Sequence, residues 1–243
     1  MKNLINLAQE DLSKPIYRII PLNYLVMMLE NQTNALAKTS SWDDPYENFF
    51  FKEKFSYQGK PVTLEHLGLI IFGQCWSLFR DSDALWRIYS MEKQSVRIST
   101  TIEKLYDSVY IDDSCMAITH IGSVEYKSKK DINEWIKLKT PITMSSIQRT
   151  SVDSLFIKRN NFSHEKEVRV IYQPDSHSAE KSNSLKIYPV DPIDFIDEIT
   201  FDPRVDDAFY QSALSEIIKY KYPLSRVKKS PLYDFKPTSI KIE

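Results

Sequence analysis

Glycine is scarce in this chain. Only four occur in 243 residues, Gly59, Gly68, Gly73 and Gly122. Walker loops and dinucleotide-binding fingerprints need closely spaced glycines, because a backbone without Cβ atoms can approach a phosphate group. Neither motif can be written from these four positions. The sequence therefore excludes the common glycine-rich nucleotide sites, and any nucleotide must be held in another way.

Cysteine is rarer still. Cys75 and Cys115 lie within apolar segments, and neither belongs to a Cys-x-x-Cys pair or lies at metal-ligand spacing from a histidine. Two free, buried thiols are the simplest expectation for these residues. The sequence predicts no metal site.

Long apolar runs and a strong net charge are also missing. Residues 1–7 become polar too early for a signal peptide, and no stretch reaches the length of a membrane span. We therefore expect a cytoplasmic protein with no membrane partner. The 32 basic and 33 acidic residues leave a formal net charge of -1, so only local basic patches could attract a polyanion. Three runs qualify as such patches: Lys127, Lys129 and Lys130; Lys158 and Arg159; and Arg226, Lys228 and Lys229.

The composition is that of an ordinary globular protein, with 42% hydrophobic and 27% charged residues. One core can serve a chain of this length, so residues 1–243 are predicted to form a single domain. Apolar periodicity alternates between strand and helix patterns without a strict βαβ rhythm, which indicates an α+β fold. The expected strands are 15–20, 35–38, a run ending at 77, 96–100, 117–126 as a strand pair or one bent strand, 167–172, 185–190 and 196–201. The expected helices are 22–31, 82–89, one capped by Thr100, 131–138 capped by Asp131, and 209–220.

The segment 163–172 carries the most informative pattern. From Glu167 onward, Glu167, Arg169 and Ile171 alternate with apolar residues, which predicts a strand with these three on one face. Glu165 and Glu167 would then lie side by side, close enough to repel each other. Two explanations remain open: a solvated strand end, or a carboxylate pair that serves a functional site.

Arg18, Ser77 and the Glu165/Glu167 pair each stand at a strand-like segment within an apolar frame. Burying such groups singly would cost about 1–3 kcal/mol each, so they are either exposed or converge. Simpler explanations also exist, because Arg18 could pair with an acidic residue across the sheet and Ser77 could be a turn or cap residue. Convergence is the hypothesis that carries functional consequences.

Four short motifs occur in the order expected for a known family. The chain resembles the uncharacterised bacterial family known as domain of unknown function 2971 in these motifs, over roughly its whole length. They are Trp-Asp-Asp-Pro-Tyr-Glu at 42–47, Cys-Trp-Ser at 75–77, Leu-Trp-Arg-Ile-Tyr at 85–89 and Glu-Lys-Glu-Val-Arg at 165–169.

The same order is similar to that of ADP-ribosyltransferases with an arginine on the first strand, a serine ending a later strand, and a Glu-x-Glu motif. Arg18, Ser77 and Glu165-Lys166-Glu167 match these three features, although Cys75 and Trp76 precede the serine where those enzymes carry threonine or serine. The resemblance implies a split β-sheet core with flanking helices, and NAD as the substrate.

The resemblance also implies roles for individual residues. Glu167 would stabilise the cation-like ribosyl centre that forms when nicotinamide leaves, and Arg18 would clamp the pyrophosphate. Ser77 would hold the ribose or brace Glu167, and Glu165 would orient or deprotonate the nucleophile. The expected NAD contacts also include three aromatic residues, of which the first two could stack on nicotinamide: Tyr17, Trp86 and Tyr89.

The predicted function is transfer of ADP-ribose to a macromolecular acceptor, RNA, DNA or protein, by a toxin or phage-defence effector. Such an activity implies a restraining partner, an antitoxin or inhibitor protein. One alternative is a non-catalytic binding or regulatory module on the same fold. A less favoured alternative is a metal-dependent nuclease that gathers Asp43, Asp44, Glu165 and Glu167 around Mg²⁺.

Overall fold

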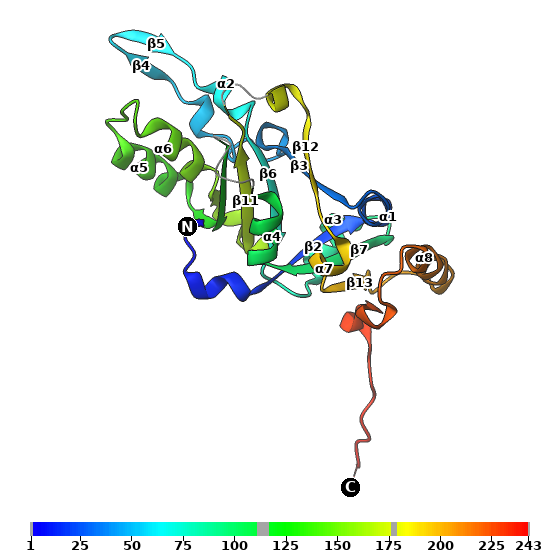
Figure 1. Cartoon of the computed structure of the whole chain (residues 1–243). Coiled ribbons are helices and arrows are strands. Elements are labelled where there is room, and N and C mark those ends of the chain that lie inside the picture. The colour runs from blue at the N-terminus through cyan, green and yellow to red at the C-terminus, as the bar shows by residue number, and fades with distance from the viewer. Residues whose placement is uncertain (1, 111–116, 176–178, 243) are drawn as a thin grey trace.

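The computed structural model describes residues 2–110, 117–175 and 179–242. A large mixed β-sheet forms its centre, and helices cover both faces of the sheet (Figure 1). The thiol of Cys115, which we expected to be buried, lies outside the described residues. None of the described helices is both long and apolar enough to cross a membrane.

Eight strands form one hydrogen-bonded path across the main sheet, and two more branch from it. In spatial order the path is β1 (Asn3–Ile5), β8 (Ile118–Ser123), β11 (Glu167–Gln173), β6 (Phe72–Ser77), β2 (Pro15–Pro21), β7 (Ser95–Thr101), β13 (Glu198–Phe201) and β14 (Val227–Lys229). The branch consists of β3 (Thr33–Lys38), which pairs with β6, and β12 (Leu185–Pro189), which pairs with β3.

The sheet divides along one edge of β6. At its end, Ser77 pairs with Tyr17 of β2, whereas Gly73 near its start pairs with Ala37 of β3. Between these two pairings the side chain of Gln74 reaches β3, where its Nε2 donates to the Ala35 carbonyl oxygen at 2.9 Å. We call this division of the sheet between β2 and β3 the fork. It confirms the predicted α+β fold with a split sheet core, and it leaves a space between β2 and β6.

Two hydrophobic cores lie on opposite faces of β11. Val168, Val170 and Tyr172 enter the larger core, and Ile171 enters the smaller one. Strand alternation places Glu167 and Arg169 on the face of Ile171, as the sequence predicted. The charged residues of β11 therefore lie on the side of the smaller core.

The helices divide between these two cores. Buried residues from α1 (Leu22–Asn31), α4 (Ile102–Val109), α7 (Pro192–Phe195) and α8 (Asp207–Lys219) join the larger core. The smaller core takes residues from α5 (Lys129–Lys139) and α6 (Ile147–Ser154). Two further helices are α2 (Glu65–Gly68), beside the smaller core, and α3 (Asp83–Tyr89), which packs on β2.

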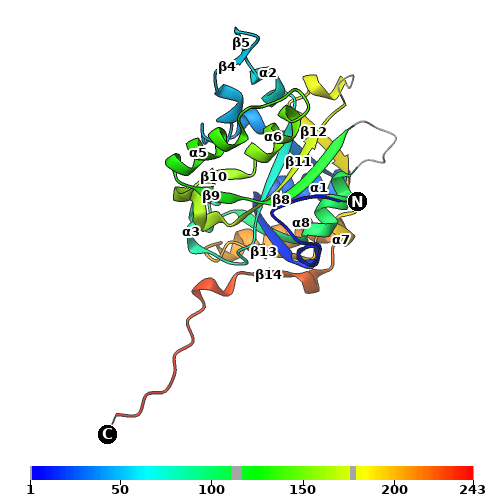
Figure 2. The same ribbon diagram turned by 90° about the vertical axis from the view of Figure 1, so that its left-hand side faces the viewer.

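Two small sheets complete the description. The hairpin of β4 (Phe55–Tyr57) and β5 (Lys60–Val62) projects from the body (Figure 1). β9 (Glu125–Lys127) and β10 (Ile157–Arg159) form a parallel pair that lies beside α5 in Figure 2. This second pair brings Lys158 next to the start of β11.

Two predicted helix caps are wrong by a few residues. Thr100 stays in β7, paired with Ile16, so Thr101 is the residue that caps α4 and accepts from the Lys104 amide. Ser128 caps α5, and Asp131 is its third helical residue, which accepts from the Ser128 amide in a capping box. The elements that were not predicted are short or polar, and they include β1, α6 and β14.

Candidate active site

A cavity of about 310 Å³ lies at the fork of the sheet. Its walls come from β2, β6 and β7, from α3, and from the segment around the Glu-x-Glu motif. This volume is at the lower end of the range for small-molecule sites, which are concave and contain a few polar groups.

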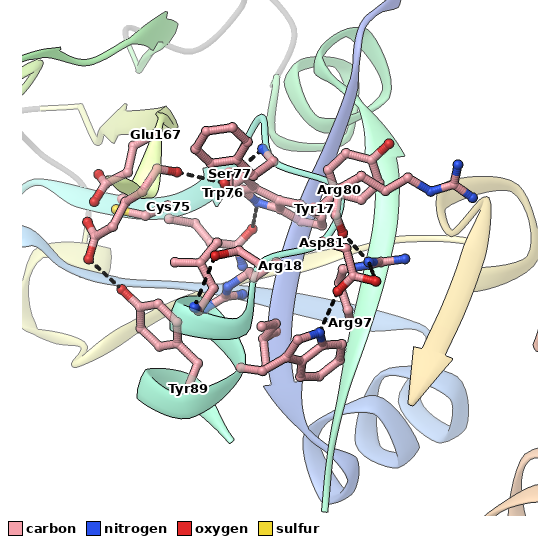
Figure 3. Close-up of a pocket in the computed structure, with 18 of the residues that line it drawn as sticks. Tyr17, Arg18, Cys75, Trp76, Ser77, Arg80, Asp81, Tyr89, Arg97 and Glu167 are labelled. Carbon is pink, nitrogen blue, oxygen red and sulfur yellow. Dashed lines mark hydrogen bonds and ion pairs between the residues drawn. The ribbon is translucent and has the colours of Figure 1, made fainter. Parts of the chain in front are cut away.

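All seven residues that we predicted for the site line this one cavity. They are Tyr17, Arg18, Ser77, Trp86, Tyr89, Glu165 and Glu167. In the view of Figure 3, Glu167 and Tyr89 lie on one side, Arg97 and Asp81 lie on the other, and Arg18 lies between them. The structure thus brings these side chains together, and their chemical roles stay predictions.

A left-handed residue brings the two motif glutamates to one place. β11 begins at Glu167, whereas Glu165 ends a 3-10 turn, Asn160–Glu165. The expectation that the two residues lie side by side along one extended chain is therefore wrong. Lys166, between them, has φ 43°. Lys166 adopts the left-handed conformation where the 3-10 turn meets β11. Both carboxylates contact the same cation although they do not share a strand.

That cation is Lys158 of β10. Its Nζ lies 2.5 Å from Oε2 of Glu165, 2.6 Å from Oε1 of Glu167 and 3.2 Å from Oε1 of Glu47. Arg169 donates from Nε to Oε2 of Glu167 at 2.6 Å and from Nη2 to Glu47. We call these five residues the carboxylate cluster. It combines three carboxylates with two cations, and all five side chains are buried.

The cluster separates the pKa values of the two motif glutamates. Burial and the neighbouring Glu167 raise the pKa of Glu165 from 4.5 to about 7. Burial also opposes ionisation of Glu167, but the charges of Arg169 and Lys158 outweigh it and lower the pKa of Glu167 well below its usual range. At neutral pH Glu167 is therefore a fixed negative charge, while Glu165 can gain or lose a proton. Such a pair is typical of acid–base sites.

Three hydroxyl groups hold the motif in position. Ser77 donates from Oγ to the Glu165 carbonyl oxygen at 2.6 Å, and Tyr89 donates to Oε1 of Glu165 at 3.0 Å. The Tyr126 hydroxyl accepts from the Glu167 amide at 2.9 Å. The Ser77 hydroxyl also accepts from the Phe79 amide at 3.0 Å. Ser77 is therefore a turn residue whose hydroxyl group also holds the backbone of Glu165.

Arg18 is the opposite case, a charge without an ion-pair partner in the part of the chain that the structure describes. Its side chain is partly buried on β2 and lines the cavity, and burial lowers the pKa of its guanidinium group. Among residues 2–110, 117–175 and 179–242, no acidic side chain forms an ion pair with it and no hydrogen bond engages its guanidinium. The simple alternative, an acidic partner across the sheet, is therefore not found within this part of the chain. An unpaired arginine in a cavity is suited to an anionic ligand.

The two aromatic residues expected to stack differ in exposure. Tyr17 is partly exposed and lies with its ring centroid 5.2 Å from the Arg97 guanidinium carbon. Trp86 is fully buried, and its indole N–H donates to Oδ1 of Asp81 at 2.6 Å. Trp86 is thus a fixed wall of the cavity, which makes Tyr17 the better candidate for stacking on a ligand.

The cations and the third carboxylate of the cluster were not among the residues predicted for the site. Arg169 shares a strand face with Glu167, and this spacing was a usable signal. Glu47 ends the motif at 42–47, whose Trp42 ring centroid lies 4.4 Å from the Arg169 guanidinium carbon. Lys158 offered no local signal, because its partners lie in a turn and a separate strand.

The predicted basic patch at Lys158 and Arg159 is wrong. Lys158 is buried in the cluster, and Arg159 pairs with Oδ1 of Asp44 at 2.8 Å. Four further lysines from the other two predicted patches also have acidic partners: Lys127 with Glu125, Lys130 with Glu134, Lys228 with Glu198, and Lys229 with Asp207.

Three of the four carboxylates expected for a nuclease site are also engaged, and Asp43 is the exception among the residues that the structure describes. Asp44 binds Arg159, and Glu165 and Glu167 bind Lys158. Within the described part of the chain, no group of three histidine, cysteine, aspartate or glutamate residues is arranged to hold a metal ion. Cys75 lines the cavity as a free thiol, and burial raises its pKa, which leaves it protonated.

Comparison with protein families confirms part of the resemblance seen in the sequence. The family described as protein of unknown function (DUF2971) matches residues 85–170. This match includes the motif at 85–89 in α3 and the Glu-x-Glu motif, whereas Ser77 and the motif at 42–47 lie outside it. No curated protein matches the sequence.

Solved structures of DarT from Thermus sp. 2.9 align with most of the chain. The complex with NAD+ has 10% identity and a TM-score of 0.40, and the alignment covers 90% of this chain and 96% of that one. The complex with ADP-ribosylated ssDNA has 12% identity and a TM-score of 0.40, with coverages of 95% and 98%. At these TM-scores the likeness carries no functional argument.

Proposed function

We propose that this protein is an NAD-consuming ADP-ribosyltransferase that modifies a macromolecule. The observation that carries the proposal is the presence of two kinds of charge in one cavity: Arg18, which has no ion-pair partner among the described residues, and Glu165 and Glu167, which belong to a cluster of three carboxylates and two cations. NAD has the complementary arrangement, with an anionic pyrophosphate and a cationic nicotinamide. Charge complementarity of this kind favours one orientation of the ligand.

The proposed roles follow from the protonation states. Arg18 would bind the pyrophosphate through paired N–H donors, which needs no glycine-rich loop. When the bond between ribose C1′ and nicotinamide breaks, the electron pair leaves with the nicotinamide and C1′ becomes cation-like. Glu167 would stabilise this positive charge, because it stays ionised. Tyr17 would stack on the ligand.

Glu165 would act on the acceptor. An acceptor nucleophile forms the new bond to C1′ and gives up a proton, which Glu165 would take. A carboxylate whose pKa is about 7 is suited to this step, because it is substantially ionised at neutral pH and still basic enough to hold the proton. Ser77 and Tyr89 would keep Glu165 in position through the bonds described above.

The biological setting belongs to the same proposal. Transfer of ADP-ribose to RNA, DNA or protein would suit a toxin or phage-defence effector, restrained by an antitoxin or inhibitor protein. The many ion-paired lysines do not favour nucleic acid over protein as the acceptor.

One observation favours a second function, a binding module without turnover. Both oxygens of Glu167 already have cationic partners, and its side chain is only 6% exposed. Catalysis would require Glu167 to act through its charge or to exchange one partner for a ribose hydroxyl. A purely structural Glu167 would leave NAD bound and intact.

The test is incubation of the purified protein with labelled NAD and a mixture of cellular RNA, DNA and protein, in the presence of EDTA. The expected result is label transfer by the wild type and its loss in Glu167→Gln, with folding of the variant checked by circular dichroism. Bound but unconsumed NAD would support the binding module. A parallel incubation without EDTA tests the nuclease: EDTA-sensitive cutting of nucleic acid, with no consumption of NAD, would contradict the proposal.

A further inference from the structure

Lys158 occupies a distinctive position in the carboxylate cluster. Within the described part of the chain, it is the one cation that contacts both Glu165 and Glu167, through Oε2 of the first and Oε1 of the second. Its side chain is 8% exposed. The ammonium group also lies 4.7 Å from the centroid of the Phe162 ring, which closes it off from another direction.

Arg169 cannot replace this contact. Its guanidinium binds the other oxygen of Glu167, together with Glu47 and the Leu155 carbonyl oxygen. No hydrogen bond or ion pair joins Arg169 to Glu165 in the structure's described ranges. Removing Lys158 would therefore leave Glu165 and Glu167 buried and adjacent with no shared cation, and one of them would bind a proton more strongly.

The geometry of Glu165 also depends on this lysine. Lys158 binds Oε2 of Glu165, and Tyr89 binds Oε1, so the two contacts fix the plane of the carboxylate. Ser77 holds the same residue by its backbone. With the backbone and one oxygen fixed by other groups, Lys158 sets the rotation that remains.

We propose that Lys158 is a positioning residue: its ammonium group holds Glu165 and Glu167 in fixed orientations at one wall of the cavity and keeps both available as carboxylates. This inference rests on the proposed transferase function for its catalytic consequence. It assigns Lys158 no contact with the reacting atoms.

Several charged or titratable groups face Glu165 and could share its protonation. They come from α3, β9, β10, β11 and the motif at 42–47, and they are Tyr89, Tyr126, Lys158, Glu167, Arg169 and Glu47. Lys158 is the member of this group that both touches Glu165 and carries positive charge, so its removal is expected to change the titration more than removal of either tyrosine.

A merely structural lysine predicts a different result from a positioning lysine. Loss of a buried ion pair lowers stability in either case. A positioning role also changes the titration of the glutamates in the folded protein and lowers kcat, while the KM for NAD stays nearly constant because Arg18 is intact. The experiment must therefore measure protonation directly and separately from stability.

The experiment uses Lys158→Gln, with Lys158→Arg as the charge-conserving variant and Lys137→Met on the exposed surface of α5 as the control. Carboxyl carbon NMR would follow Glu165 and Glu167 against pH. We expect Lys158→Gln to raise at least one midpoint by about one pH unit or more, with restoration in Lys158→Arg and no change in the control. The kcat for NAD consumption should fall about 100-fold in Lys158→Gln, with the pH profile displaced in the same direction as the NMR midpoints.

Unchanged midpoints in a folded Lys158→Gln protein would overturn the inference. If this variant does not fold, the double variant Lys158→Met with Glu47→Gln removes one carboxylate together with the cation, and the same NMR measurement decides. A wild type that consumes no NAD would contradict the proposed function, whereas the NMR result would still support or refute the role of Lys158.

Discussion

The two charged regions of the cavity are built in opposite ways. In the carboxylate cluster every charge has a partner within 2.6 Å, from Lys158 to both motif glutamates and from Arg169 to Glu167 and Glu47. Arg18, on the same cavity, has no ion-pair partner among the described residues. Paired charges hold a structure together, whereas a partly buried charge without a partner costs free energy until a ligand arrives. The charges of the carboxylate cluster are already paired, whereas Arg18 is available to bind an anion.

The largest expected effect comes from breaking the paired region. Arg169→Met would remove one of the two buried cations that contact Glu47 and Glu167 and leave Lys158 as the other, and breaking a buried pair typically costs about 3–5 kcal/mol. The measurement is chemical denaturation. The matched control is Arg149→Met, whose 56% exposed side chain pairs with Asp153, where we expect about 0–1 kcal/mol. Equal losses in the two variants would show that the cluster does not stabilise the fold.

The next largest effect is the pH dependence of stability that the ionisation of Glu165 causes. Its folded pKa is raised from 4.5 to about 7, so its contribution to stability is fully present below pH 4.5 and is lost as the pH rises through 7. The loss amounts to at most about 3–4 kcal/mol, because a pKa that differs by one between the folded and unfolded states corresponds to about 1.4 kcal/mol. Glu165→Gln should therefore flatten the stability profile between pH 4.5 and 7.

Glu167 gives the opposite dependence of stability on pH in the same measurement. Its pKa is lowered, so its contribution is present above pH 4.5 and is lost as the pH falls below that value. Glu165→Gln should keep this acid limb. A wild-type profile with no decline between pH 4.5 and 7 would contradict the assignment of the raised pKa to Glu165.

Removing the charge of Arg18 should weaken NAD binding and leave the stability of the fold intact. Arg18→Met is expected to weaken NAD binding by about 10- to 100-fold, because a hydrogen bond to a charged group contributes about 1.5–3 kcal/mol. The stability of the fold should be unchanged or slightly higher, since a partly buried cation is lost. Calorimetric titration and thermal unfolding measure the two quantities on one sample.

The control for this variant is Arg87→Met. Arg87 is 62% exposed and pairs with Asp83 on α3, outside the cavity lining. Its removal should leave NAD affinity within about twofold of the wild type. If Arg18→Met destabilised the fold as Arg169→Met does, the contrast between the two regions would not hold.

The smallest effect belongs to a single hydroxyl group. Tyr89→Phe removes the donor to Oε1 of Glu165 and keeps the ring. A net hydrogen bond of about 1 kcal/mol predicts a roughly fivefold loss of NAD turnover and a modest rise in the pKa of Glu165. Tyr24→Phe on the exposed surface of α1 is the control. A loss as large as that of Glu167→Gln would mean that Tyr89 has a more direct role.

The sequence predicted the parts of this site that lie at strand ends. Glu167 belongs to a strand with clear apolar alternation, whereas Arg18 and Ser77 belong to apolar runs, and adjacent strands bring such residues together. Strand alternation also placed Arg169 beside Glu167. These predictions succeeded because a strand has a fixed period, which is visible in the sequence.

The remaining parts of the site depend on pairings that the sequence does not encode locally. Lys158 reaches the glutamates because β10 pairs with β9 and because Lys166 adopts a left-handed conformation. A lysine in a basic run has the same local pattern whether it is solvated or buried. Trp86 shows the reverse problem, since a tryptophan beside a cavity can be a stacking surface or, as here, a buried wall.

The most direct test is a crystal structure of the protein with a non-cleavable analogue of NAD. We expect the pyrophosphate within hydrogen-bond distance of the Arg18 guanidinium, and the ribose carbon that bears nicotinamide beside Glu165 and Glu167. An analogue bound elsewhere, or bound in this cavity with its pyrophosphate away from Arg18, would contradict the claim that the unpaired arginine and the paired carboxylates serve one ligand.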